Sequence, residues 1–149
     1  MRNAYNERIP HIALRITYLA LRKGASMNKQ IRMFTDLEAW QLGHEFVIDV
    51  YKKTNDFPKY EIYGVVNQLR RSAASITSNI AEGFSRYSYK EKVRFYYIAR
   101  GSISESQNHI IISRDVGYLP FETADALLSK ADRIRQIING LIRATETQL

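Results

Sequence analysis

Residues 68–86 read Gln68-Leu69-Arg70-Arg71-Ser72-Ala73-Ala74-Ser75-Ile76-Thr77-Ser78-Asn79-Ile80-Ala81-Glu82-Gly83-Phe84-Ser85-Arg86. Apolar side chains recur at steps of three and four, which is the period of one helix face. The stripe begins upstream and consists of Ile62, Val65, Val66, Leu69, Ala73, Ile76 and Ile80. The pattern predicts a helix that begins near Tyr60 and ends at Gly83, a residue suited to a left-handed helix cap.

A polar stripe lies on another face of this predicted helix. It contains charges of both signs and consists of Arg71, Ser75, Ser78, Asn79 and Glu82. Two interpretations are open. In one, an ion-pair network fixes the helix register or subunit contacts, with Asn79, Glu82 and Glu105 as its members. In the other, the surface binds phosphate through its basic residues. We expect charges of this helix, Arg70, Arg71, Glu82 and Arg86, to meet Arg100 and Glu105 of the next one.

The first helix is expected to begin at Thr35. Thr35 and Glu38 match a capping box, in which both side chains accept hydrogen bonds from backbone N–H groups. The helix should end before Pro58, and its apolar stripe consists of Leu37, Trp40, His44, Val47, Ile48 and Tyr51. We interpret His44 as a hydrogen-bonded core residue.

The third helix begins with a second capping box at Ser88 and Glu91 and extends to about Val116, with Gly117 as its cap. Its apolar surface is broader than one bundle core requires, which suggests that another subunit covers part of it. Pro120 begins the fourth helix. Its stripe consists of Ala124, Leu127, Leu128, Ala131, Ile134, Ile138, Leu141 and Ile142.

Four amphipathic segments with short connections predict an all-α protein, an antiparallel up-down-up-down four-helix bundle over residues 34–149. A chain of 149 residues can bury one core. It has no cysteine, which fits a reducing compartment such as the cytoplasm. No apolar run approaches the ~20 residues that cross a bilayer, so we expect no membrane association.

The net charge of +7 is distributed unevenly. Residues 1–33 hold seven basic residues and one acidic residue, whereas the remainder holds fifteen and fourteen. The basic character therefore belongs to an N-terminal extension, residues 1–33. This extension either contacts phosphates or a membrane surface, or is an untethered terminus.

The chemistry-bearing residues do not form a recognisable catalytic pattern. A di-iron bundle needs Glu-x-x-His on two helices, whereas Glu105 and His109 are four apart and occur once. No glycine-rich phosphate loop or nucleophile elbow is present. We therefore predict no enzyme activity, no cofactor and no metal. The nucleic-acid-binding candidates are basic residues on or beside the second and third helices: Arg70, Arg71, Arg86, Lys90, Lys92, Arg94 and Arg100.

Several segments resemble a known family. They are Thr35–Trp40 followed by His44, Phe57-Pro58 with Glu61 and Tyr63, Gln68–Ala73, Ser78–Phe84, and Ala99–Ser102. Together they resemble the four-helix-bundle family encoded in intervening sequences of bacterial 23S ribosomal RNA genes. That family is also similar to the accessory variability determinant of diversity-generating retroelements.

The resemblance implies a homopentamer of antiparallel bundles with a nucleic-acid-binding role. If the gene lies beside one for a reverse transcriptase, the resemblance implies that this enzyme is a partner of the protein. We expect a non-enzymatic homo-oligomer that binds RNA or DNA. The alternative is a self-assembling scaffold for a protein partner, in which the charged stripe has a structural role.

Overall fold

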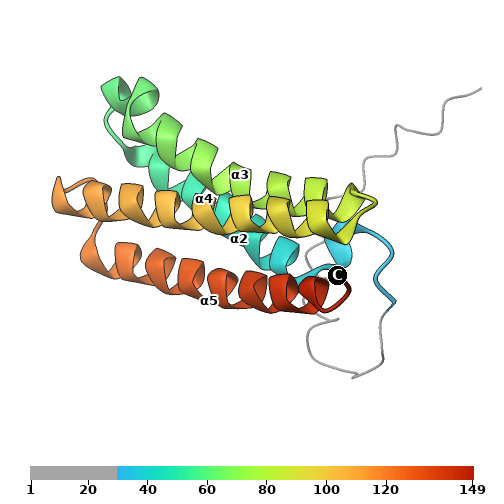
Figure 1. The fold of residues 1–149 in the computed structure, drawn as a ribbon. Coiled ribbons are helices and arrows are strands. Elements are labelled where there is room, and N and C mark those ends of the chain that lie inside the picture. The colour runs from blue at the N-terminus through green and yellow to red at the C-terminus, as the bar shows by residue number, and fades with distance from the viewer. Residues whose placement is uncertain (1–29) are drawn as a thin grey trace, which may run out of the picture. The chain divides into compact units, whose positions relative to one another are not determined.

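Four α-helices form the part of the chain that a computed structural model describes, residues 30–149. The helices are α2 (Glu38–Lys53), α3 (Val65–Ser85), α4 (Tyr89–Asp115) and α5 (Phe121–Glu146), shown in Figure 1. Short 3-10 helices η1 (Phe34–Asp36), η2 (Thr54–Asp56) and η3 (Lys59–Tyr63) flank α2 and precede α3. No strand occurs in this region, so the all-α prediction is confirmed. The predicted extension lies outside the described residues except for residues 30–33.

Cross-helix contacts have the register expected of antiparallel neighbours. From α4 to α5, Tyr97 pairs with Glu146 and Gln107 with Asp132, so residue numbers rise in one helix as they fall in the other. Serine pairs between α3 and α4 follow the same rule. The helix ribbons in Figure 1 agree with this alternation. The up-down-up-down order is thus consistent with the contacts of the bundle.

The bundle core is built from one face of each helix. Its fully buried large side chains include Phe46, Leu69, Ile76, Ile80, Ile103, Ile110, Ile134 and Ile138. The stripes predicted for α3 and α5 largely coincide with their buried faces. Burial of each such side chain contributes roughly 1.5–3 kcal/mol, so this cluster is the main source of stability.

The first helix turns a different face to the core than the sequence predicts. Its buried residues are Ala39, Gly43, Phe46 and Val50. His44 is exposed and stacks on Trp40, with ring centroids 4.9 Å apart, so its interpretation as a core residue is wrong. Small residues at 39 and 43 allow close helix approach, and a Cβ on Gly43 would lie 3.1 Å from Thr77 Cγ2. Of the other residues in the predicted stripe, Leu37 is buried and Trp40 and Val47 pack against the core, whereas Ile48 and Tyr51 are exposed.

Two predicted helix starts are displaced. Thr35 lies in η1 and α2 begins three residues later, because Asp36 Oδ2 accepts hydrogen bonds at 3.1 Å from the N–H groups of Arg32 and Met33 and closes a separate turn. The second helix begins at Val65 rather than near Tyr60, since Gly64 has a non-helical backbone.

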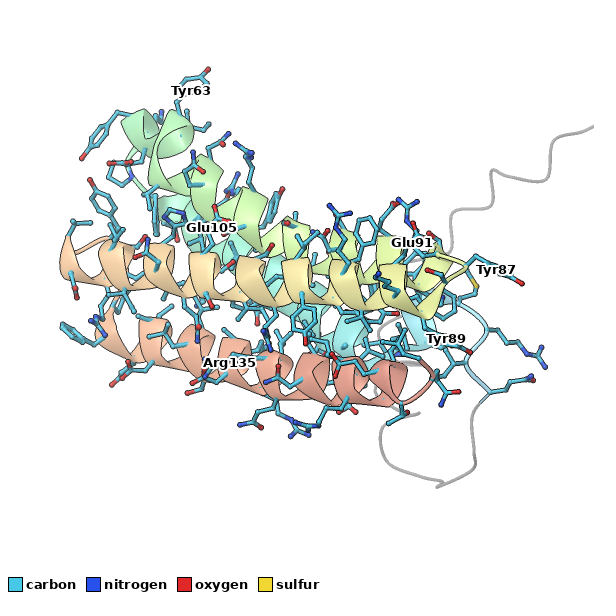
Figure 2. All side chains as sticks on the ribbon, viewed as in Figure 1. Tyr63, Tyr87, Tyr89, Glu91, Glu105 and Arg135 are labelled. Atoms are coloured by element: carbon cyan, nitrogen blue, oxygen red, sulfur yellow. The ribbon has the colours of Figure 1, made fainter. Side chains whose placement is uncertain are left out.

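Glu61 links the start of α3 to the turn that follows α4. One of its carboxylate oxygens accepts the Val65 N–H at 3.0 Å, and the other accepts the Tyr118 hydroxyl at 3.0 Å. The Tyr118 hydroxyl also lies 3.3 Å from that of Tyr60. The neighbouring Tyr63 points away from the helices (Figure 2) and is 91% exposed.

The two helix ends predicted at glycines have opposite outcomes. Helix α3 continues to Ser85, and Gly83 is a buried interior residue, so the predicted cap there is wrong. Gly117 has φ +86°, which confirms the predicted left-handed cap of α4. The N–H groups of Tyr118 and Gly117 bond the carbonyls of Ser113 and Arg114, which is the Schellman arrangement.

Replacing Gly117 with alanine should lower the free energy of unfolding by about 1–2 kcal/mol, because an L side chain is disfavoured at positive φ. A Cβ there would meet no atom within 4 Å, so the effect is one of backbone conformation. Urea unfolding measures it. Gly101→Ala in the middle of α4 is the control and should be stabilising; equal effects at both sites would contradict this explanation.

Candidate nucleic-acid interface

Arg70 attaches α3 to the end of α2. Its Nε donates to Thr54 Oγ1 at 2.8 Å, and its guanidinium carbon lies 4.8 Å from the Tyr51 ring centroid. Thr54 in turn donates to the Val50 carbonyl. These contacts satisfy the side chain within the bundle, so Arg70 has a structural role here.

Two more candidates stabilise the turn between α3 and α4. Arg86 forms an ion pair with Glu82, and its guanidinium lies over the Phe95 ring at 4.7 Å. Lys92 donates to the Phe84 carbonyl at 2.6 Å, and burial lowers the pKa of its ammonium group. Both side chains hold the turn together.

The expected charged network between α3 and α4 is not formed by the described residues. Glu82 pairs with Arg86 on its own helix, and Glu105 lies 3.9 Å from His109 on α4. Asn79 does join a network, since its Nδ2 donates to the carbonyl and the hydroxyl of Ser75. The helices meet instead through neutral hydroxyl groups.

Those hydroxyls form a cluster along the α3–α4 contact. Ser106 donates to Ser72 at 2.9 Å, and the hydroxyls of Ser75 and Ser102 lie 2.8 Å apart. Ser102 and Ser106 also have hydrogen bonds to carbonyls one turn earlier in α4. Every hydroxyl is thereby satisfied, as buried polar groups require.

Three predicted residues remain available to a ligand. Arg71, Lys90 and Arg94 are exposed and form no hydrogen bond or ion pair with the described residues. Arg100 is half-buried; it donates to Asn139 of α5 at 3.1 Å and lies 4.7 Å from the Tyr97 ring centroid. An exposed arginine without an acidic partner keeps its full charge for an anion.

Three of the predicted basic residues and Tyr97 follow one side of α4 at spacings of three and four residues. Together with one residue of α5 they define what we call the basic–aromatic face: Lys90, Arg94, Tyr97, Arg100 and Arg135. Two shallow depressions lie on either side of Tyr97, which lines both. Figure 2 shows Arg135 on α5 beside the ribbon of α4.

Tyr97 is the aromatic centre of this face. Its ring is 41% exposed, and its hydroxyl donates to Glu146 at 2.8 Å. That hydrogen bond raises the pKa of the phenol, so the ring is neutral at physiological pH. A neutral ring between basic side chains can stack on a nucleobase while they contact phosphates.

Like Tyr97, Arg135 belongs to the basic–aromatic face but is not among the nucleic-acid-binding residues predicted from the sequence. It forms an ion pair with Asp132 at 2.7 Å, three residues earlier in α5. Asp132 also accepts from Gln107 of α4. Its place beside Arg100 depends on the register between α4 and α5, for which the sequence has no signal.

Other kinds of site are not evident in residues 30–149. No group of three potential metal ligands occurs among them, and none of their helices is both long and apolar enough to cross a bilayer. Within the same residues, the basic–aromatic face combines unpaired basic side chains with an exposed aromatic ring, and we take it as the candidate ligand-binding surface.

The fold defines a helical-bundle protein with basic and aromatic side chains along α4 and α5. The family model described as 23S rRNA-intervening sequence protein matches residues 35–140. The chain belongs to this family, as the resemblance in its sequence indicates.

A solved structure supports the same fold. The chain is similar to a Bacteroides thetaiotaomicron protein of unknown function from the S23 ribosomal protein family, with a TM-score of 0.63 and 19% identity. The match covers 70% of this chain and 97% of the other. Among curated proteins, none matches.

Proposed function

We propose that the protein is a non-enzymatic homo-oligomer that binds RNA or DNA through the basic–aromatic face. The observation on which this rests is that Lys90 and Arg94, one helical turn apart, are exposed without ion pairs to other described residues, on the face that also holds Tyr97 and Arg100. Glu91 lines the same depression, and its carboxylate accepts a hydrogen bond from Ser88. Basic side chains with an interleaved aromatic ring are the usual composition of a nucleic-acid surface. The family takes its name from 23S rRNA intervening sequences, and we therefore choose an rRNA fragment as the first probe.

Fluorescence anisotropy with a labelled 23S rRNA fragment over a salt series tests the proposal. The double variant Lys90→Glu/Arg94→Glu should weaken binding about tenfold and reduce the slope of log K against log salt by about two, because two phosphate contacts are lost. Lys52→Glu/Lys53→Glu is the matched control, since both lysines are exposed on α2.

Three results bear on the proposal. Loss of binding in the α4 variant alone supports it. Equal loss in both variants would indicate attraction to net charge rather than to a defined face. No binding by the wild-type protein at low salt would contradict the proposal itself.

The oligomer rests on apolar surface that the described residues leave uncovered. Exposed apolar residues occur on α2, with Ile48 and Tyr51, and on α4, with Ile98 and Ile112. Ile48 and Tyr51 are one helical turn apart on α2, and adjacent exposed apolar side chains can form a contact with a second subunit, so we begin the test there. We propose a homopentamer, as the family resemblance implies, in the cytoplasm. Light scattering should give five times the monomer mass, and Ile48→Glu should reduce it.

The same apolar surface favours a second candidate, a scaffold that binds a protein partner. For a gene beside a reverse transcriptase, that enzyme is the partner we expect. Affinity capture with wild-type protein and with the Ile48→Glu variant discriminates the candidates. Loss of the reverse transcriptase together with unchanged RNA binding would favour the scaffold.

A further inference from the structure

The depression on the α5 side of Tyr97 is lined in part by a glycine inside α4, Gly101. A glycine in the middle of a helix lowers its stability relative to alanine. A Cβ at Gly101 would meet no atom within 4 Å, so packing within the described chain does not explain the small side chain. The open space is bounded by two helices, and its lining includes Tyr97, Arg100, Gly101 and Ser104 of α4 and Arg135 and Asn139 of α5.

The lining side chains are held in place by their neighbours. Arg100 donates to Asn139 Oδ1 and stacks on Tyr97, Tyr97 donates to Glu146, and Arg135 pairs with Asp132. A guanidinium group has five N–H donors, so Arg100 and Arg135 both retain donors for another ligand. The amide group of Asn139 likewise keeps its two N–H donors, because only its oxygen is used by Arg100.

This chemistry fits one ligand class. A planar guanidinium stacked on an aromatic ring is a surface on which an unpaired base can stack. An amide N–H can donate to an acceptor on the base edge, and a second arginine can contact the adjacent phosphate. Duplex RNA or DNA cannot present a base in this way, because its bases are stacked and paired.

We propose that the depression over Gly101 binds an unpaired nucleotide of a single-stranded nucleic acid. The base lies against Arg100 and Tyr97 with its edge at Asn139, and Arg135 contacts the phosphate. This inference rests on the proposed function and assigns its ligand as single-stranded. A second copy of the chain is the other conceivable occupant. The unused N–H donors of Arg100, Arg135 and Asn139 favour the nucleotide, because a nucleotide presents phosphate oxygens and base-edge acceptors to them.

The test fills the depression without weakening the fold. Gly101→Leu places a side chain in the open space and also raises helix propensity, so the variant should melt no lower than wild type. Gly140→Leu is the matched control, since Gly140 is a helical glycine of α5 with no atom near its Cβ position, and it does not line the depression. The probes are a labelled oligouridylate and an RNA duplex of equal length.

We expect Gly101→Leu to weaken oligouridylate binding by about tenfold, which is within the range for loss of one stacked base. Duplex binding, and both kinds of binding by Gly140→Leu, should be unchanged. If the wild-type protein binds RNA and Gly101→Leu binds the oligouridylate equally well, the inference is overturned while the proposed function stands. If the wild-type protein binds neither probe, both fail. A lower oligomer mass for Gly101→Leu would assign the depression to a second copy and overturn the inference.

Discussion

Gly83→Leu is expected to lower the free energy of unfolding by about 3 kcal/mol through overpacking of the α3–α4 contact. Gly83 is buried inside α3, and any Cβ at this position would lie 2.7 Å from Tyr96 Cε1 and 3.0 Å from Phe95 Cβ. The Tyr96 ring is only 3% exposed and has little room to move away. Thermal unfolding should show the loss as a decrease in Tm of about 10 °C, given the size of the chain.

Gly140→Leu separates this packing effect from helix propensity. Both substitutions replace a helical glycine with a good helix former, but a Cβ at position 140 meets no atom within 4 Å. The control should therefore be neutral or stabilising. An unchanged Tm for Gly83→Leu would contradict this explanation, because it would show that α3 and α4 can move apart at this point without loss of stability.

Alkaline pH should destabilise the protein through Tyr96. Burial raises the pKa of this phenol to about 12, whereas an unfolded tyrosine has a pKa of about 10. The folded state thus holds the phenol proton more tightly. The resulting stability is fully present below pH 10 and is lost as the pH rises towards 12. A shift of this size corresponds to roughly 2–3 kcal/mol.

Tyr96→Phe removes the ionising group but keeps the ring. The Tyr96 hydroxyl forms no hydrogen bond with the described residues, so the variant should be about as stable as wild type at neutral pH. Urea unfolding at about pH 9 and about pH 11.5 should show a loss in wild type that exceeds the loss in the variant by roughly 2 kcal/mol. Parallel losses would assign the pH dependence to other groups, of which Tyr118 is one, since its hydrogen bonds with Tyr60 and Glu61 also raise its pKa.

The sequence predicts the four helices because their apolar stripes are long and their termini have distinct signals. Ser88 caps α4 by accepting the Glu91 N–H, and Gly117 ends the same helix. The predictions that failed involve competition between two local signals. Asp36 closes a separate turn before α2, which displaces the predicted helix start. Gly83 resembles a helix stop in the sequence, but it is a glycine inside α3 because a Cβ there would clash with the Tyr96 ring.

The candidate interface is predictable only in part, because the sequence does not reveal which arginines are already paired. Of the predicted candidates, Lys90, Arg94 and Arg100 belong to the basic–aromatic face, and Arg71 is exposed on α3. Arg70 and Arg86 have the same local sequence character, yet aromatic rings and hydrogen bonds within the bundle hold them. Cation–π contacts and side-chain-to-backbone hydrogen bonds depend on side-chain rotamers and on helix register. No repeating pattern in the sequence predicts either of these.

Trp40 is the chain's one tryptophan; it packs against the core from α2 and stacks on the exposed His44. It is not among the residues of the basic–aromatic face. Its intrinsic fluorescence is therefore a built-in reporter that needs no label and responds to events at α2. Dilution of the protein while recording tryptophan emission would follow subunit dissociation at α2, and an RNA titration that leaves this emission unchanged would place the bound RNA away from α2.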